Sequence, residues 1–99
     1  MMKLWIDDVR PAPQGYMWII TTKEAIKTIL AFRNDIEEIS LDHDAGEYVA
    51  YGGDYIKILD KMEEKGINNI SIHLHTANPV GRENMRRIIK KNEWKEVFH

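Results

Sequence analysis

The stretch ISIHLHTANPVGRENM, Ile70–Met85, decides both the fold and the site of this chain. Its first six residues alternate strictly between apolar and polar, which predicts a strand with one apolar face and one polar face. His73 and His75 share the polar face. The strand therefore delivers two imidazoles to one side of a sheet.

A helix is expected directly after this strand. Asn78 is placed as its N-cap and Pro79 as its first residue, because Asn accepts hydrogen bonds from the first turn and proline lacks an N–H that would need one. The N–H groups at a helix start favour an anion, and Arg82 lies in the first turn. Histidines, a helix start and an arginine together predict a phosphate site.

The composition limits the classes of protein to which the chain can belong. Its 99 residues suffice for one core, so we expect a single domain over residues 1–99. A formal net charge of −2 argues against a broad surface that coats nucleic acid. No apolar run has transmembrane length, the N-terminus lacks a signal-peptide pattern and there is no cysteine. These features predict a soluble, cytoplasmic protein without a membrane partner.

The rest of the chain alternates between strand and helix patterns. Apolar, aromatic and β-branched runs predict further strands at Met2–Ile6, Tyr16–Ile20, Ile36–Leu41 and Trp94–Phe98. The proline-rich segment Arg10–Gly15 cannot be helical and should run extended.

Two more helices are expected before the one at Asn78. The first starts at Thr21, which forms a capping box with Glu24, and the second starts at Asp54 and closes at Gly66. The residues expected to be buried on the three helices are Ala25, Ile26, Ile29, Leu30 and Phe32, then Tyr55, Ile58, Leu59 and Met62, then Met85, Ile88 and Ile89. The residues expected to be solvated on the last helix are Arg86, Arg87, Lys90 and Lys91.

Repetition of strand and helix predicts an α/β fold with a parallel five-stranded sheet. Strands covered on both faces are usually continuous apolar runs, whereas Ser40, Ser71 and the two histidines interrupt strands three and four. The helices should therefore lie mainly on one face. If Asp8–Gly15 formed a hairpin, the acidic strand ends would be separated, but about eight extended residues span ~26 Å and can instead return along the barer face.

The carboxyl ends of parallel strands meet at one edge, where open α/β sheets bind their ligands. The polar residues expected at this edge are Asp7, Asp8, Asp42, His43, Asp44, His75 and Thr76. Most of them have a structural alternative, such as a local ion pair with Arg10, turn hydrogen bonds, or a histidine satisfied by Ser40 or Ser71. Their convergence from separate segments favours a functional site.

Three motifs resemble a known family. LWIDDVRPAP near the start, ISLDHD in the middle and IHLHTANPVGRENM later look like the cyclic-phosphate-processing receiver domain family, which is related to the receivers of two-component signalling. The resemblance implies a receiver-like (flavodoxin-like) sheet of order 2-1-3-4-5 that lacks the first and last helices. It implies that Asp7 and Asp8 form the acidic pair, that Asp42 occupies the phosphoacceptor position, and that Thr76 contacts phosphate.

The chain also departs from ordinary receivers. The lysine that receivers carry at the end of strand five has no counterpart in Trp94–Phe98. His43, His73 and His75 are not receiver features. The resemblance therefore implies a hydrolytic variant rather than a phosphorelay component.

The resulting hypothesis is metal-assisted hydrolysis of a cyclic phosphate on a nucleotide or an RNA end. Asp7, Asp8 and Asp42 would hold Mg²⁺ or Mn²⁺, because these cations take oxygen ligands. The catalytic candidates are Asp42 and the three imidazoles of His75, His43 and His73, of which one would activate water and another would protonate the leaving oxygen. The expected phosphate contacts are Thr76, Asn78, Gly81, Arg82 and Arg10.

Other functions remain open on the sequence alone. A receiver-like regulatory or binding module would accept a phosphoryl group at Asp42 without turnover. A metal-binding protein would share Zn²⁺ among His73, His75 and His43, since histidines two apart on a strand can meet at one ion. The barer sheet face also suits a homodimer. The sequence does not choose between 2′,3′- and 3′,5′-cyclic phosphates.

Overall fold

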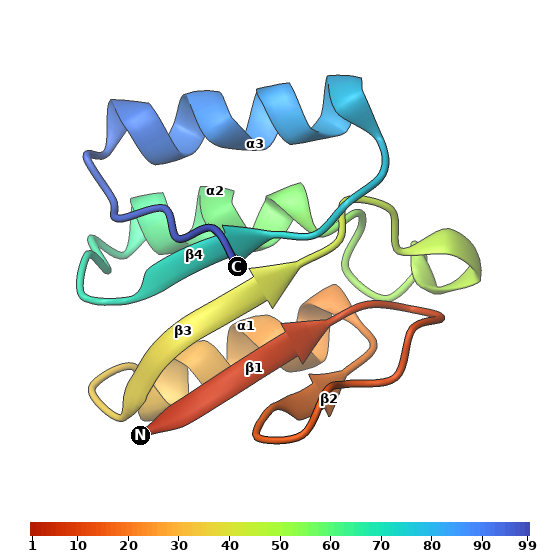
Figure 1. Cartoon of the computed structure of the whole chain (residues 1–99), viewed down its shortest axis with the longest axis horizontal. Coiled ribbons are helices and arrows are strands. Elements are labelled where there is room, and N and C mark those ends of the chain that lie inside the picture. Colours follow the sequence, from red (N-terminus) through yellow and green to blue (C-terminus); the bar gives the residue numbers. More distant parts are fainter.

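The computed structural model describes residues 1–99 as a four-stranded, all-parallel sheet with three α-helices. The strands are β1 (Met2–Ile6), β2 (Met17–Ile19), β3 (Ile36–Leu41) and β4 (Ser71–Leu74). The helices are α1 (Thr22–Phe32), α2 (Ile56–Glu64) and α3 (Pro79–Lys91), with a short 3₁₀ helix η1 at Gly46–Tyr48. The sheet order is β2-β1-β3-β4, so the receiver-like arrangement is confirmed for these four strands (Figure 1).

The fifth strand predicted at Trp94–Phe98 is wrong. This segment lies beside β4 but forms a single bridge, in which Ile72 donates to Lys95 and accepts from Val97 at 2.9 and 2.8 Å. Trp94 is instead buried in the core, and Glu96 pairs with Arg86 of α3 at 2.6 Å. These two anchors, rather than a strand ladder, account for the alternating pattern.

The core lies between the sheet and the helices. Leu4, Ile39 and Ile72 are in register across β1, β3 and β4 and belong to one apolar cluster with Ile29 of α1 and Met85 of α3. In Figure 1, α1 and α2 lie behind the sheet and α3 runs along its β4 side. All three helices contribute residues to this one core, as expected for helices that lie mainly on one face of the sheet.

The opposite face of the sheet, which we call the barer face, carries a row formed by Trp5, Ser40 and His73 from three neighbouring strands. The connection from β1 to β2 contains no helix, as expected from its prolines. Its Arg10 carbonyl accepts a hydrogen bond from the Trp5 indole at 3.0 Å, and Tyr16 packs edge-on against the same indole. The proline segment therefore contacts the barer face.

Two of the predicted helix starts are confirmed by their caps. The Thr21 hydroxyl accepts a hydrogen bond from the N–H of Glu24 at 3.1 Å, and Asn78 Oδ1 accepts one from the N–H of Gly81 at 3.0 Å. Pro79 begins α3 as expected. These caps fix where the segments that follow β2 and β4 turn back along the sheet.

The predicted cap of α2 is wrong. Tyr55 precedes this helix without a side-chain cap, because the Asp54 carboxylate accepts a hydrogen bond from the N–H of Ala45 at 3.0 Å. Asp54 thus holds the loop after β3 rather than the helix. Gly66 does close α2, in the left-handed conformation (φ 65°) that its lack of a Cβ permits.

Burial follows the predicted stripes with three corrections. Leu30 and Phe32 are exposed on α1, since its buried stripe consists of Thr22, Ala25 and Ile29. Arg86 was expected in solvent, but the carboxylate of Glu96 covers it in a partly buried pair. None of the helices has the length and the apolar run that crossing a bilayer would require.

Candidate functional site

Three carboxylates meet at the carboxyl edge of the sheet. Asp7 and Asp8 follow β1, and Asp42 follows β3, its parallel neighbour. One oxygen from each lies within 4.8 Å of the other two, and we call this group the carboxylate rim. The predicted convergence of these segments is confirmed, because parallel pairing of β1 with β3 ends both strands at the same edge.

Asp7 is the most buried member of the rim, with 1% of its surface exposed. Its Oδ1 accepts hydrogen bonds from the N–H groups of Val9 and Arg10 at 2.9 and 3.0 Å, and its Oδ2 contacts Nε2 of His75 at 2.9 Å. Burial alone would raise the pKa of this carboxyl, but these partners outweigh it and the pKa lies below its ordinary value. Asp7 is therefore a fixed, ionised anchor.

Asp8 has the opposite balance. Burial and then the negative charges of Asp7 and Asp42 raise its pKa. Its Oδ2 fills the space beside Gly46, where any Cβ would overlap it, and Gly46 adopts a left-handed φ of 58°. The loop after β3 is thus shaped to admit this carboxylate into a crowded acidic group.

The donor chemistry of the rim fits a hard divalent cation. Carboxylate oxygens are the ligands that Mg²⁺ and Mn²⁺ take in proteins. The pKa of Asp8 is raised first by burial and then by the charges of Asp7 and Asp42, and a bound cation would offset that repulsion. The three residues therefore fit the Mg²⁺ or Mn²⁺ ion of the hydrolysis hypothesis.

A chain of hydrogen bonds runs from the rim onto the barer face. Beyond Asp7, His75 Nδ1 lies 2.8 Å from the Ser40 hydroxyl, which lies 2.7 Å from Nδ1 of His73. Because Asp7 is ionised, His75 donates from Nε2 and accepts at Nδ1 when neutral. Ser40 then donates to His75 and accepts from the Nδ1–H of His73, so the direction of every bond is set.

His75 is engaged on every side. Both of its ring nitrogens are bonded, its ring stacks on Trp5 with centroids 3.8 Å apart, and 7% of its side chain is exposed. Burial lowers its pKa, although Asp7 opposes this effect. This geometry suits a residue that orients Asp7 more than one that exchanges protons with a substrate.

His43 has a free ring nitrogen. Its Nδ1 lies 2.9 Å from Asp44, which leaves Nε2 without a partner, and 15% of its side chain is exposed. The ring packs on Gly81 of α3, where an added Cβ would lie 2.5 Å from it. Gly81 therefore serves as a seat for the imidazole.

The start of α3 offers fewer free donors than expected. Pro79 has no N–H and that of Gly81 is used by the Asn78 cap, which leaves Val80 in the first three positions. Arg82 donates to the Thr76 carbonyl at 2.5 Å. An anion at this helix start would therefore meet one free N–H together with the remaining guanidinium donors.

Thr76 and Arg10 complete the edge. Thr76 is buried and its hydroxyl oxygen accepts from the N–H of Asn78 at 3.0 Å, while its own proton remains available. Arg10 is exposed and donates to the His75 carbonyl at 3.3 Å. The structure thus places all of the predicted site residues along this edge or, for His73, on the adjoining barer face.

The sequence reasoning missed several supporting residues. Ser40 was expected only as a partner that could satisfy a histidine, and no role in the site was expected for Trp5 or Gly46. Trp18 also supports the rim, since its indole donates to the Asp7 carbonyl at 2.8 Å. The alternation of β3 placed Ser40 on the histidine face, but the strand register that joins it to both imidazoles was not visible in one sequence.

The zinc group suggested earlier, His73 with His75 and His43, is not assembled in the structure. Ser40 occupies the position between the first two rings, and His43 is grouped instead with Asp44 and Asp54. A shared ion at these three histidines is therefore not supported by their placement.

Comparison with known families identifies one relationship. A family model described as the cyclic-phosphate processing receiver domain matches residues 2–91. Searches among curated proteins and among solved structures found no match. The resemblance carried by the three motifs is confirmed by the family match.

Proposed function

Because the chain belongs to the cyclic-phosphate processing receiver domain family, we propose that it hydrolyses a cyclic phosphate on a nucleotide or an RNA end. The observation that carries this proposal is the carboxylate rim, with three carboxylate oxygens within 4.8 Å at the sheet edge where α/β folds bind ligands. The His75 imidazole contacts Asp7 of the rim, and α3 begins in the segment that follows the same strand, β4.

Asp7, Asp8 and Asp42 would hold the divalent cation. When bound, the cation neutralises phosphate charge and increases the acidity of a water molecule. Asp7 would be the fixed ligand, since two backbone N–H groups and His75 already orient it. The bond from His75 then acts on the geometry of the rim, as hydrogen bonds to metal ligands do.

The reaction requires a proton to be removed from water and another to be delivered. The water oxygen forms a bond to phosphorus, one ring P–O bond breaks, and the departing oxygen takes up a proton. His43 is suited to both transfers, because Asp44 fixes its Nδ1 and leaves its Nε2 lone pair free. It would accept the proton of the attacking water and return it to the leaving oxygen.

The phosphoryl oxygens carry negative charge that the protein must balance. Arg10 is exposed and tethered beside His75, and Arg82 retains donors beyond the one given to Thr76. The Thr76 hydroxyl and the Val80 N–H would supply two further donors. These groups lie along the segment from His75 to Arg82 and would fix the phosphate relative to His43.

The decisive experiment is turnover of adenosine 2′,3′-cyclic phosphate and of its 3′,5′ isomer, with Mg²⁺ or Mn²⁺, followed by phosphorus NMR. We expect a monoester from one isomer and no product in EDTA. Asp42→Asn should abolish turnover, and His43→Gln should reduce it about 10²–10⁴-fold, the range of general acid–base catalysis. Asp60→Asn, a charge change on the exposed side of α2, is the matched control and should leave the rate unchanged.

A second function is favoured by one observation, the position of Asp42 beside the acidic pair Asp7 and Asp8, as in a phosphoaccepting receiver. Stable modification of Asp42 by acetyl phosphate, without turnover of either cyclic substrate, would establish this regulatory module and overturn the hydrolase. Full turnover in His43→Gln would refute the proton-transfer role alone.

A further inference from the structure

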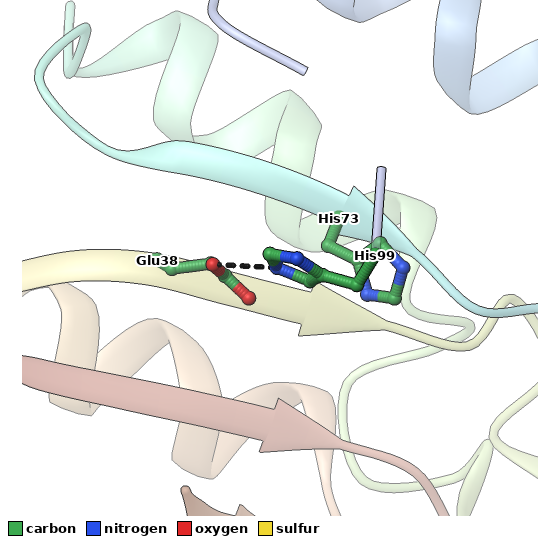
Figure 2. A group of neighbouring side chains, drawn as sticks. All are labelled: Glu38, His73 and His99. Atoms are coloured by element: carbon green, nitrogen blue, oxygen red, sulfur yellow. Dashed lines mark hydrogen bonds and ion pairs between the residues drawn. The ribbon is translucent and has the colours of Figure 1, made fainter. Parts of the chain in front are cut away.

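A second group of metal-binding side chains lies on the barer face, away from the carboxylate rim. Glu38 of β3, His73 of β4 and His99 beyond α3 bring one carboxylate oxygen and two ring nitrogens within 4.8 Å of one another. Figure 2 shows the three side chains gathered in front of the sheet. We propose that they form a Zn²⁺ site.

The donor set matches zinc better than magnesium. Two imidazoles and one carboxylate are the ligands of many zinc sites that leave the fourth tetrahedral position to water, whereas magnesium sites are built from oxygen. His99 Nε2 and Glu38 Oε1 lie 3.0 Å apart. Two ligand atoms at zinc distances and a tetrahedral angle are separated by about 3.3 Å, so the pair needs little movement.

The hydrogen bonds of Glu38 leave one carboxylate oxygen, Oε1, to bind an ion. The Tyr16 hydroxyl donates to its Oε2, and Oε1 faces His99. The Glu38 side chain is 7% exposed, while that of His99 is 52% exposed. An ion can therefore reach the group from the His99 side, and the His99 ring can exchange its Nε2 proton for one at Nδ1 through solvent.

His73 is prepared by the hydrogen-bond chain described above. Its Nδ1 is taken by Ser40, which leaves Nε2 for an ion. Metal-bound histidines commonly donate their other ring N–H to a protein oxygen, which fixes the tautomer. Ser40 donates to His75, and His75 donates to the ionised Asp7. Ser40 can therefore only accept from His73, which keeps the His73 proton on Nδ1 and leaves Nε2 free, and this is the tautomer that a zinc ion needs.

The test is a calorimetric titration of the whole chain with Zn²⁺ in millimolar Mg²⁺, which competes at the carboxylate rim. We expect one zinc ion per chain. His99→Gln keeps an N–H that can donate to Glu38 but removes a ligand, and it should weaken zinc binding at least tenfold with little change in the thermal midpoint of the metal-free protein. Asp42→Asn should change zinc affinity less than about twofold.

Visible spectroscopy with Co²⁺ tests the proposed zinc ligands without any activity measurement. Co²⁺ in place of Zn²⁺ should give the visible absorption of a tetrahedral nitrogen and oxygen site, and His99→Gln should remove it. Absence of zinc binding, zinc affinity that survives His99→Gln, or zinc affinity that disappears in Asp42→Asn would overturn the proposal. Because the rim and this site share no ligand, failure here would leave the proposed hydrolysis intact.

Discussion

Replacing Asp8 by asparagine should stabilise the metal-free protein. The pKa of Asp8 is raised by burial and by the charges of Asp7 and Asp42, so the ionised side chain costs folding free energy that a neutral amide does not. Two unit charges 4.8 Å apart, the upper limit of the oxygen separations in the rim, repel by roughly 1 kcal/mol in a water-like dielectric and by ~3 kcal/mol at an effective dielectric constant of 20. Because Asp8 is partly exposed, we expect about 1–2 kcal/mol.

Calorimetric unfolding at neutral pH in EDTA measures this gain. For a domain of this size, each kcal/mol moves the midpoint by about 4–8 °C, so Asp8→Asn should unfold roughly 5–10 °C above the wild type. The sign also sets a pH dependence. The folded pKa of Asp8 lies above 3.8, so its cost is complete at neutral pH and fades as the pH falls through the folded pKa.

The same unfolding measurement is then repeated with Mg²⁺ in place of EDTA. A cation that binds the rim should raise the unfolding midpoint of the wild type more than that of Asp8→Asn, since the variant offers the cation one carboxylate ligand fewer. Asp60→Asn controls for a general change in net charge. A lower midpoint for Asp8→Asn in EDTA, or a gap between variant and wild type that stays constant from pH 7 to pH 4, would refute the reasoning.

Three further predictions concern the histidines. Gly81→Ala should destabilise by about 1–2 kcal/mol despite the usual helical gain, because the methyl group would meet the His43 ring 2.5 Å away; urea unfolding measures it. Ser40→Ala removes the hydroxyl shared by His73 and His75 and should cost about 1–3 kcal/mol, measured in the same way. Burial lowers the pKa of both imidazoles from 6.5, so the unfolded chain binds protons first and the urea midpoint should fall as the pH drops below about 6.5.

Controls separate these effects from general disruption. Ser71→Ala changes a partly exposed serine on the same face and should shift the urea midpoint little. A Gly81→Ala protein as stable as the wild type would show that His43 moves away without cost. A urea midpoint that rises in acid would show that the barer-face imidazoles are not held neutral.

Most strands and helices could be predicted from the sequence, because hydrophobic periodicity and helix caps depend on residues only a few positions apart. Thr21 and Asn78 cap their helices as predicted, since each needs only a neighbour three residues away. Asp54 does not cap α2, because its carboxylate accepts a hydrogen bond from the Ala45 N–H. Ala45 lies in the loop after β3, and the course of this loop could not be predicted from a local sequence pattern. The segment after α3 failed as a strand for a related reason, because its alternation reflects contacts with α3 and the core.

The sequence predicted which residues come together in the site. It did not predict most of the hydrogen bonds between them. Parallel pairing brought Asp7 and Asp42 together without further information. The engagement of both His75 nitrogens depends on the register of β3 with β4, which places Ser40 beside His73. His99 lies too far along the chain from Glu38 for any local pattern to join them.

The central position of β1 has a consequence for how the protein assembles. Parallel neighbours cannot form through a tight turn, and β1 pairs with β3 only after all of β2 and α1 intervene. Such long-range pairings close large loops and slow folding. We therefore expect Asp7 and Asp42 to come together late in folding, and we expect a partly unfolded species that releases β1 to lack the proposed cation site.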